Sequence, residues 1–447
     1  MRRRGVIAAL VFLTLFGSQQ VFAQTTKSAK MQDVFFKGSL ERPVSLDEPP
    51  RPIEPVTVKP SWTTTQPAVD AGGWSRAFGN NRLNSRSSYS PGRGPWTLRW
   101  KCDLPGSPAP PAQFVLADAD RIAVQTDSDW KLYDTDGALI GQGVHAGGLL
   151  LDGPFETLFF PDTDGDISAR KLSDARSRFT IEAFFDESFA RTYFARREDA
   201  LFVLGVELDI DPHRHHRPEL SVAQFIHMGE EPKVDLDGYL EPQLGPQPLL
   251  RKSTRVLAVL GESRVTLATP GAIYQVNFKL EIVDSFGGEF NPIAMSLDEQ
   301  DRICLLVDAE GVRQVWLLTP LGKRIMASRL PAPLHAAAHP PIIGYNRRIY
   351  MHTSSHIAAI EPDGSLAWMR PALHRFGGVA ITADDKLLAS DGGEIVYFGP
   401  SGERVTVHDF KSDRLATAPV LTDKGELIVA GEKHLYCLTP PAKQKPE

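Results

Sequence analysis

The 447-residue chain has few cysteines, no surplus of basic residues and no long apolar run beyond its N-terminus. Its three cysteines are too few for a disulfide framework. With 49 basic and 55 acidic residues, the formal net charge is -6, so electrostatics gives no reason to expect a nucleic-acid partner. Apolar residues nevertheless make up 42% of the chain, which is enough to bury a sizeable core.

Residues 1–23 have the pattern of a signal peptide. Arginines at positions 2 to 4 precede an apolar run over 6–16, which is too short to cross a bilayer comfortably. We expect cleavage before Gln24, with a retained signal anchor as the alternative. No cysteine follows the apolar run before Cys102, which argues against a lipid anchor of the bacterial lipoprotein type. The mature chain is therefore expected to be periplasmic or secreted, without a membrane span after signal removal.

Three further regions follow the signal peptide. Residues 24–72 are polar, rich in proline and without periodicity, so we expect a disordered leader that acts as a spacer, a docking segment or a plain linker. From about residue 97, short apolar runs alternate with turns rich in Asp, Gly, Pro and Ser, and no convincing amphipathic helix is found. We predict one all-β domain over 73–440 and a disordered tail over 441–447.

The apolar runs of this domain are periodic. Most steps between equivalent strands are 36 to 46 residues, and a longer step from Leu201 to Val265 contains an insertion. Eight units of about 40 residues predict an eight-bladed β-propeller with four strands in each blade, with seven blades as the alternative. The equivalent strands begin near Ile122, Leu158, Leu201, Val265, Ile303, Ile349, Leu387 and Leu427.

The last unit is predicted to take its fourth strand from the N-terminal end of the domain. In other units a glycine closes the turn before the fourth strand, but the same position in the last unit is Ala442, near the end of the chain. Residues 97–101 read like the fourth strand at 365–369. Because an unpaired edge is a liability, we predict that 97–103 pairs with 434–438 and closes the ring. The turn glycines are Gly137, Gly364 and Gly402.

Two stretches carry a family resemblance. Residues 357–368 contain an apolar strand, an Asp-Gly turn and a strand with Trp368. The start of the domain contains Trp74, Phe78-Gly79-Asn80, Gly94-Pro95 and Leu98-Arg99-Trp100. In these features the chain resembles the pyrroloquinoline-quinone-repeat, or quinoprotein-like, β-propellers over about residues 74–440. Most other units have drifted, because tryptophan is missing after Gly137, Gly322 and Gly402.

The resemblance implies one of two functional classes. One contains dehydrogenases that hold the quinone and a calcium ion over the central channel, usually beside an adjacent Cys-Cys pair. The other contains non-catalytic propellers, including an outer-membrane-assembly lipoprotein. Here the cysteines are far apart, at positions 102, 304 and 437, and no Cys-x-x-Cys-His motif is present. We therefore expect a non-catalytic secreted member without a cofactor, with a quinone-dependent dehydrogenase as the alternative and a hydrolase or lyase third.

Three clusters could hold a metal ion, and each also has a simpler interpretation. Asp162-Thr163-Asp164-Gly165-Asp166 has alternating carboxylates but not the glycine and glutamate of a calcium loop, so we interpret it as a hairpin turn. The histidines of 213–216, with His227, lie in the long insertion and are interpreted as a solvated loop, although a metal site is left open. His335 and His339 are four residues apart, as two zinc ligands on a helix would be. No glutamate follows His335, however, so the zinc-protease motif is absent.

The three cysteines are predicted to be free thiols. Cys102 and Cys437 lie on neighbouring strands in the predicted closure, and export would permit a disulfide. The predicted register, however, places Cys437 opposite Leu98 and Cys102 opposite Lys433. That offset of four residues corresponds to roughly 14 Å, beyond disulfide reach.

Four residues form a predicted partner-binding rim. Glu289, His335, His374 and Arg414 lie 13 or 14 residues before the strand markers of four successive units, at the loop that leads into each inner strand. The alternative is that loop ends are polar in any protein. As a site, the rim would gain positive charge when histidines protonate below about pH 6.5, and it would bind an anionic or polar group of a protein or envelope component. The sequence assigns no oligomeric state.

Overall fold

The structure is a computed structural model, and the part of the chain that it describes consists of β-strands, turns and one 3-10 helix, η3 (Ala332–Leu334). In that part, no helix is long and apolar enough to cross a membrane. The predicted signal peptide, most of the predicted leader and 442–447 of the predicted tail lie outside it. The described residues are 50–55, 87, 89, 95–104, 113–118, 120–126, 128–164, 166–181, 189–197, 200–207, 220–226, 233–239, 257–261, 264–277, 282–411, 413–422 and 424–441.

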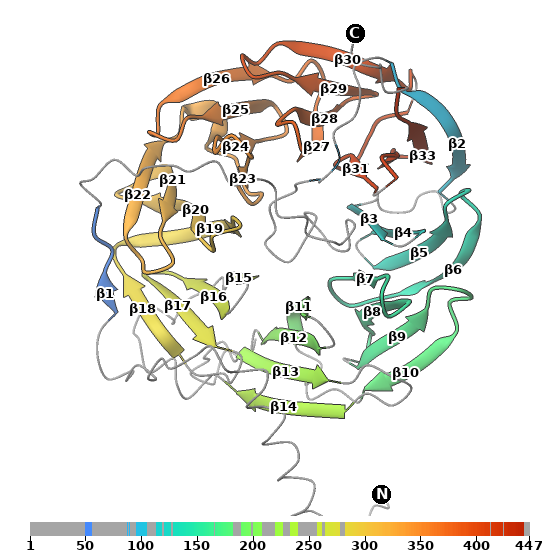
Figure 1. The fold of residues 1–447 in the computed structure, drawn as a ribbon, viewed down its shortest axis with the longest axis horizontal. Coiled ribbons are helices and arrows are strands. Elements are labelled where there is room, and N and C mark those ends of the chain that lie inside the picture. The colour runs from blue at the N-terminus through green and yellow to red at the C-terminus, as the bar shows by residue number, and fades with distance from the viewer. Residues whose placement is uncertain are drawn as a thin grey trace, which may run out of the picture. The chain divides into compact units, whose positions relative to one another are not determined.

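The described strands form eight sheets, which Figure 1 shows arranged around a centre. Sheet 1 contains β3 (Phe114–Asp118), β4 (Arg121–Gln125), β5 (Asp129–Asp134) and β6 (Leu139–Val144). Sheet 2 contains β7 (Leu150–Asp152), β8 (Thr157–Pro161), β9 (Ile167–Lys171) and β10 (Ser177–Ile181). Sheet 3 contains β11 (Phe189–Arg197), β12 (Ala200–Glu207), β13 (Leu220–Ile226) and β14 (Lys233–Tyr239). Sheet 4 contains β15 (Leu257–Leu260), β16 (Arg264–Thr269), β17 (Ala272–Asn277), β18 (Ile282–Gly287) and the added strand β1 (Arg51–Pro52).

The remaining four sheets follow in chain order. Sheet 5 contains β19 (Phe290–Leu297), β20 (Ile303–Ala309), β21 (Val312–Leu318) and β22 (Arg324–Arg329). Sheet 6 contains β23 (Ile342–Ile343), β24 (Ile349–His352), β25 (His356–Ile360) and β26 (Leu366–Pro371). Sheet 7 contains β27 (Phe376–Ile381), β28 (Leu387–Asp391), β29 (Glu394–Phe398) and β30 (Arg404–Asp409). Sheet 8 contains β31 (Val420–Leu421), β32 (Leu427–Ala430), β33 (His434–Thr439) and β2 (Thr97–Asp103).

The apolar runs become strands that are buried on both faces. Strands β20 (ICLLVDA) and β28 (LLASD) are buried along almost their whole length, because a neighbouring sheet covers each of their faces. Outer strands such as β22 (RIMASR) instead alternate between buried and exposed side chains near their ends. This difference explains why the inner strands read as continuous apolar runs in the sequence.

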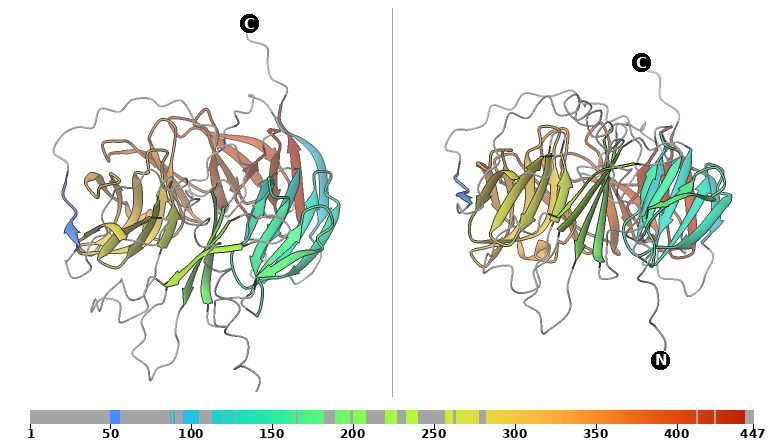
Figure 2. Two further views of the ribbon diagram at one scale, coloured as in Figure 1. Left: turned by 60° about the horizontal axis from the view of Figure 1, so that its bottom comes forward. Right: turned by 90° about the horizontal axis from the view of Figure 1, so that it is seen from below.

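The apolar core lies between the sheets. Separate clusters of buried side chains join sheet 4 to sheet 5, 5 to 6, 6 to 7, 7 to 8, 8 to 1 and 1 to 2. Figure 2 shows the sheets from the side, with their strands running between the two faces of the ring. Eight sheets in the described residues agree with the count of eight repeats in the sequence, and the predicted all-β class is confirmed.

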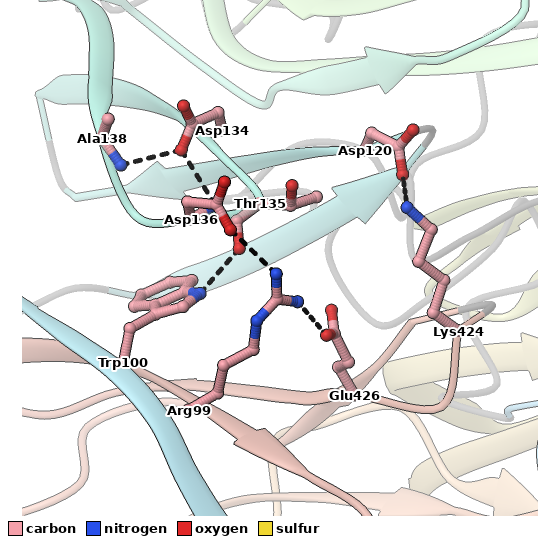
Figure 3. A network of polar contacts seen from close by, with 9 residues as sticks. All are labelled: Arg99, Trp100, Asp120, Asp134, Thr135, Asp136, Ala138, Lys424 and Glu426. Carbon is pink, nitrogen blue, oxygen red and sulfur yellow. Dashed lines mark hydrogen bonds and ion pairs between the residues drawn. The ribbon is translucent and has the colours of Figure 1, made fainter.

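The predicted ring closure is confirmed. Strand β2 pairs antiparallel with β33, from Thr97 opposite Thr439 to Asp103 opposite His434, and so supplies the outer strand of sheet 8. Figure 3 shows the polar contacts at this junction, where Arg99 forms ion pairs with Glu426 of its own sheet and with Asp136 of sheet 1. A second ion pair across the junction joins Lys424 and Asp120.

Large side chains of the outer strands pack on turn glycines of the next sheet. A Cβ atom on Gly137 would lie 2.8 Å from the Trp100 ring, and one on Gly402 would lie 2.7 Å from Trp368. Each indole N–H donates to the carbonyl two residues before its glycine, at 2.6 Å for Trp100 and 3.0 Å for Trp368. Both glycines also have positive φ, which other residues adopt at a cost. The same arrangement places Phe286 against Gly322 and Met326 against Gly364.

The predicted register within sheet 8 is wrong by up to two residues. Cys437 lies opposite Trp100 rather than Leu98, and Cys102 lies opposite Leu435 rather than Lys433. A β-bulge between Leu98 and Trp100 contributes to the shift, and single-sequence alignment of strands does not reveal a bulge. The two cysteines are therefore diagonal neighbours rather than four residues apart, and all three cysteines are free in the structure.

Residues 50–55 differ from the expectation of a disordered leader. Strand β1 pairs parallel with β18, with Arg51 opposite Phe286. Ile53 donates its N–H to Gly287 at 3.0 Å, and its side chain packs on the core between sheets 4 and 5. Arg324 of β22 donates to Glu54 at 2.8 Å. This short segment thus covers the edge of sheet 4 and reaches sheet 5, and proline suits such an edge position because it needs no ladder donor.

Candidate functional site

One end of the sheets carries all the histidines that the structure describes. Because neighbouring strands are antiparallel, the loops that lead into each first strand share an end with the loops that join second and third strands. Hydrogen bonds join such loops between sheets, as from Leu415 N–H to Gly392 at 2.7 Å. We call this end the histidine face and the other end the opposite face. The histidines are His145, His335, His339, His352, His356, His374, His408 and His434.

Two of these histidines form a stacked pair. The rings of His339 and His352 are parallel within 2°, with centroids 4.6 Å apart. His352 ends strand β24 and is 7% exposed. Burial, with a smaller contribution from the neighbouring His339, lowers the pKa of His352 to about 3. Burial also lowers the pKa of His145, and partial desolvation by the surrounding residues lowers that of His339, although His339 is exposed at the surface.

The four residues of the predicted rim lie on the histidine face in four successive sheets. Glu289 directly precedes Phe290, which pairs with the second strand of its sheet, and His374 lies two residues before Phe376, which does the same. Arg414 directly precedes Leu415, which forms a bridge with Gly431 just after the second strand of sheet 8. His335 differs from the predicted equivalence: it ends the 3-10 helix η3 and lies well before β23. All four side chains are exposed, and because they belong to different sheets they extend along the face.

Two buried carboxylates hold the loops of this face in place. Asp391, which is completely buried, accepts the N–H groups of Leu373 and His374 at 2.9 Å each, and Arg404 at 3.4 Å. These bonds satisfy the carboxylate with donors from one loop and one strand, which is how a buried charge becomes tolerable.

Asp413 plays the same part in sheet 8. It is 3% exposed and accepts N–H groups of Lys433 and His434 at 3.2 and 3.1 Å. The hydroxyl of Tyr436 and the Nδ1 of His434 approach the same oxygen, both at 2.9 Å. Both acids thus organise backbone and neighbouring side chains of the face.

The metal candidates of the sequence have mixed outcomes. Asp162 accepts the N–H groups of Asp164 and Asp166 and the hydroxyl of Ser168, so its two oxygens organise the turn between β8 and β9. This agrees with the interpretation as a hairpin turn. The histidines at 213, 215, 216 and 227 lie outside the described residues. Among the residues that are described, no group of three or more His, Cys, Asp or Glu could hold a metal ion.

The cysteines do not fit the quinone site that the resemblance implies. Cys304 lies in β20 within the core between sheets 5 and 6, and Cys437 lies in β33 between sheets 8 and 1. Burial raises the pKa of Cys437 to about 12 and that of Cys102 to about 11. None of the three lies in an innermost strand, so no cysteine pair stands beside the centre of the ring.

No family model and no curated protein matches the sequence. Solved structures do match. A europium-containing methanol dehydrogenase is 9% identical with a TM-score of 0.57, over 83% of this chain and 98% of that one. BamB from Moraxella catarrhalis is 10% identical with a TM-score of 0.51, over 78% and 99%. The Dos1 propeller is 9% identical with a TM-score of 0.53, over 79% and 97%.

The chain is a β-propeller. Identities near 10% show the fold alone, and the same fold carries both an enzyme and other proteins in this comparison. Function must therefore be argued from the face itself. The sequence reasoning found the rim residues but missed Asp391 and Asp413, because their donors lie some 17 to 21 residues away in the chain.

Proposed function

We propose that the protein is an extracytoplasmic, non-enzymatic propeller whose histidine face binds a protein partner. The proposal rests on the buried acids Asp391 and Asp413. Their carboxylates accept hydrogen bonds from backbone N–H groups of the loops and thereby hold the face in place. A face whose loops are fixed in advance loses less conformational entropy on binding. The basic start and apolar run of residues 1–23 support export.

The chemistry of the rim favours an anionic partner. Arg414 is always charged, and it stands with exposed His335 and His374 on the same face. A carboxylate of the partner would pair with Arg414 and accept hydrogen bonds from the two imidazoles. Glu289, at the other end of the rim, would repel an anion and so help to set the orientation of the partner.

The test is a pull-down from an envelope fraction with the variant His335→Ala, His374→Ala, Arg414→Ala. We expect the variant to keep the melting temperature of the parent and to recover much less partner, at pH 6 and at pH 8. The matched control is Lys323→Ala, Lys424→Ala, which removes two exposed cations of the opposite face. Equal recovery by the parent and the rim variant at both pH values would show that the rim is ordinary surface.

A quinone-dependent dehydrogenase is the alternative, and its test is separate. Purified protein is mixed with pyrroloquinoline quinone and calcium, freed of excess quinone by gel filtration, and assayed for dye reduction with alcohols and sugars. The scaffold proposal predicts no retained quinone absorbance and no dye reduction. Retained quinone with turnover would replace the proposal by the enzymatic one.

A further inference from the structure

The loop at 372–376, which joins sheets 6 and 7, presents an apolar side chain at its tip. Leu373 is 63% exposed, the highest value among the exposed large apolar side chains of the described residues. His374 and Arg375 beside it are exposed as well. A single exposed leucine is common on protein surfaces, so exposure alone does not mark a contact site, and what distinguishes Leu373 is how its loop is held.

Hydrogen bonds from two sides fix the backbone of this loop. On the side of sheet 6, Ala372 donates to Ser355 at 2.8 Å and Phe376 donates to Ser354 at 2.9 Å. On the side of sheet 7, Asp391 accepts the N–H groups of Leu373 and of the next residue, as described above. The amide groups of nearly the whole loop are thus satisfied by its neighbours, and the exposed leucine stands on a rigid base.

The turn after Asp391 holds the loop from its far end. Gly392 donates to the Arg375 carbonyl at 2.9 Å and accepts from Leu415 at 2.7 Å. A Cβ atom on Gly392 would lie 2.7 Å from the Cβ of His374, so only glycine permits this approach. Through Gly392, the loop at 372–376 and the loop that carries Arg414 are joined into one surface.

The charge of the joined surface is mixed, with a cation next to the leucine. Its exposed cations are Arg375, Lys411, Arg414 and Lys433, and its exposed acids are Asp409 and Glu432. Glu432 lies 3.8 Å from Arg414, and Asp409 accepts the backbone N–H of Lys411. Arg375 directly follows His374 and is the cation nearest in sequence to the exposed leucine.

We propose that Leu373 is the apolar anchor of the partner site and that it enters an apolar pocket edged by carboxylates on a protein partner. This rests on the proposed function and adds the contact chemistry to it. An apolar side chain on a fixed loop loses little conformational entropy on binding, and the neighbouring Arg375 is of a residue type that is enriched in binding hot spots. Carboxylates at the edge of the pocket would pair with Arg375.

The experiment selects twelve-residue peptides from a display library on the full parent protein and measures affinities of the synthetic peptides by fluorescence anisotropy. The variants are Leu373→Ala and Arg375→Glu. The control is Leu321→Ala, because Leu321 is 61% exposed in a turn of the opposite face. We expect peptides that combine an apolar residue with Asp or Glu, and an at least tenfold loss of affinity with both variants but not with the control.

Three results would overturn the proposal. If acidic peptides bind the Leu373→Ala variant as tightly as the parent, Leu373 is not the anchor. A scaffold function through another part of the surface would remain. Enrichment of basic peptides would contradict the charge of the partner. A library that yields no binder to the parent would count against both the anchor and the proposed function.

Discussion

Buried His352 should make the protein lose stability on mild acidification. A pKa of about 3 in the folded state lies well below the ordinary value near 6.5 that the imidazole regains on unfolding. Between these values the unfolded chain binds a proton that the folded chain does not, so stability falls as the pH falls through 6.5. At pH 5.0 the linkage amounts to about 2 kcal/mol, against nearly nothing at pH 7.5.

The assay compares unfolding free energies from urea denaturation at pH 7.5 and pH 5.0. The variant His352→Phe keeps a ring against His339 but cannot take up a proton. Between the two pH values, the parent should lose about 2 kcal/mol more than this variant. The control is His356→Phe, four residues away on β25, where the ring is only half-buried. If parent and His352→Phe lose the same amount, His352 is not held neutral by burial and the reasoning is refuted.

Three further predictions test the fold. Thiol titration of unreduced, denatured protein should find three thiols, and a count of one would mean that two cysteines are bonded. Gly402→Ala should lower the free energy of unfolding by about 2–4 kcal/mol, because the new Cβ meets Trp368. The control Gly311→Ala should lower it by only about 1 kcal/mol, because nothing lies within 4 Å of a Cβ there. Equal losses would contradict the packing of Trp368 on Gly402. Replacing Arg51 and Ile53 by alanine should speed hydrogen exchange at the Arg324 amide, which donates to Glu54, and unchanged exchange would show that residues 50–55 do not stay on sheets 4 and 5.

Much of the fold could be predicted because it depends on local patterns. Short apolar runs separated by turns indicated the strands of an all-β domain, and the missing last strand indicated closure by 97–103. The register of that closure could not be predicted, because the bulge after Leu98 depends on packing across two sheets. Strand β1 was missed because the run Pro50-Arg51-Pro52 has no strand period and pairs with residues more than two hundred positions away.

The candidate site was predictable only in part. Charged residues before the inner strands could be counted along the sequence, and three of the four rim residues have comparable places in the structure. His335 differs because Pro331 and Pro333 favour a turn, and η3 forms there instead of a direct entry into the strand. The role of Asp391 depends on N–H donors in the loop between sheets 6 and 7, and the exposure of Leu373 depends on a loop geometry that no periodicity reveals.

Cross-linking of the purified protein–partner complex with a lysine-reactive reagent, followed by mass spectrometry, tests the central claim most directly. Lys411 and Lys433 are exposed on the histidine face, and Lys323 and Lys424 are exposed on the opposite face. If the histidine face binds the partner, intermolecular cross-links should involve Lys411 or Lys433 and spare the other two. Cross-links confined to Lys323 and Lys424 would place the partner on the opposite face and contradict the proposed function.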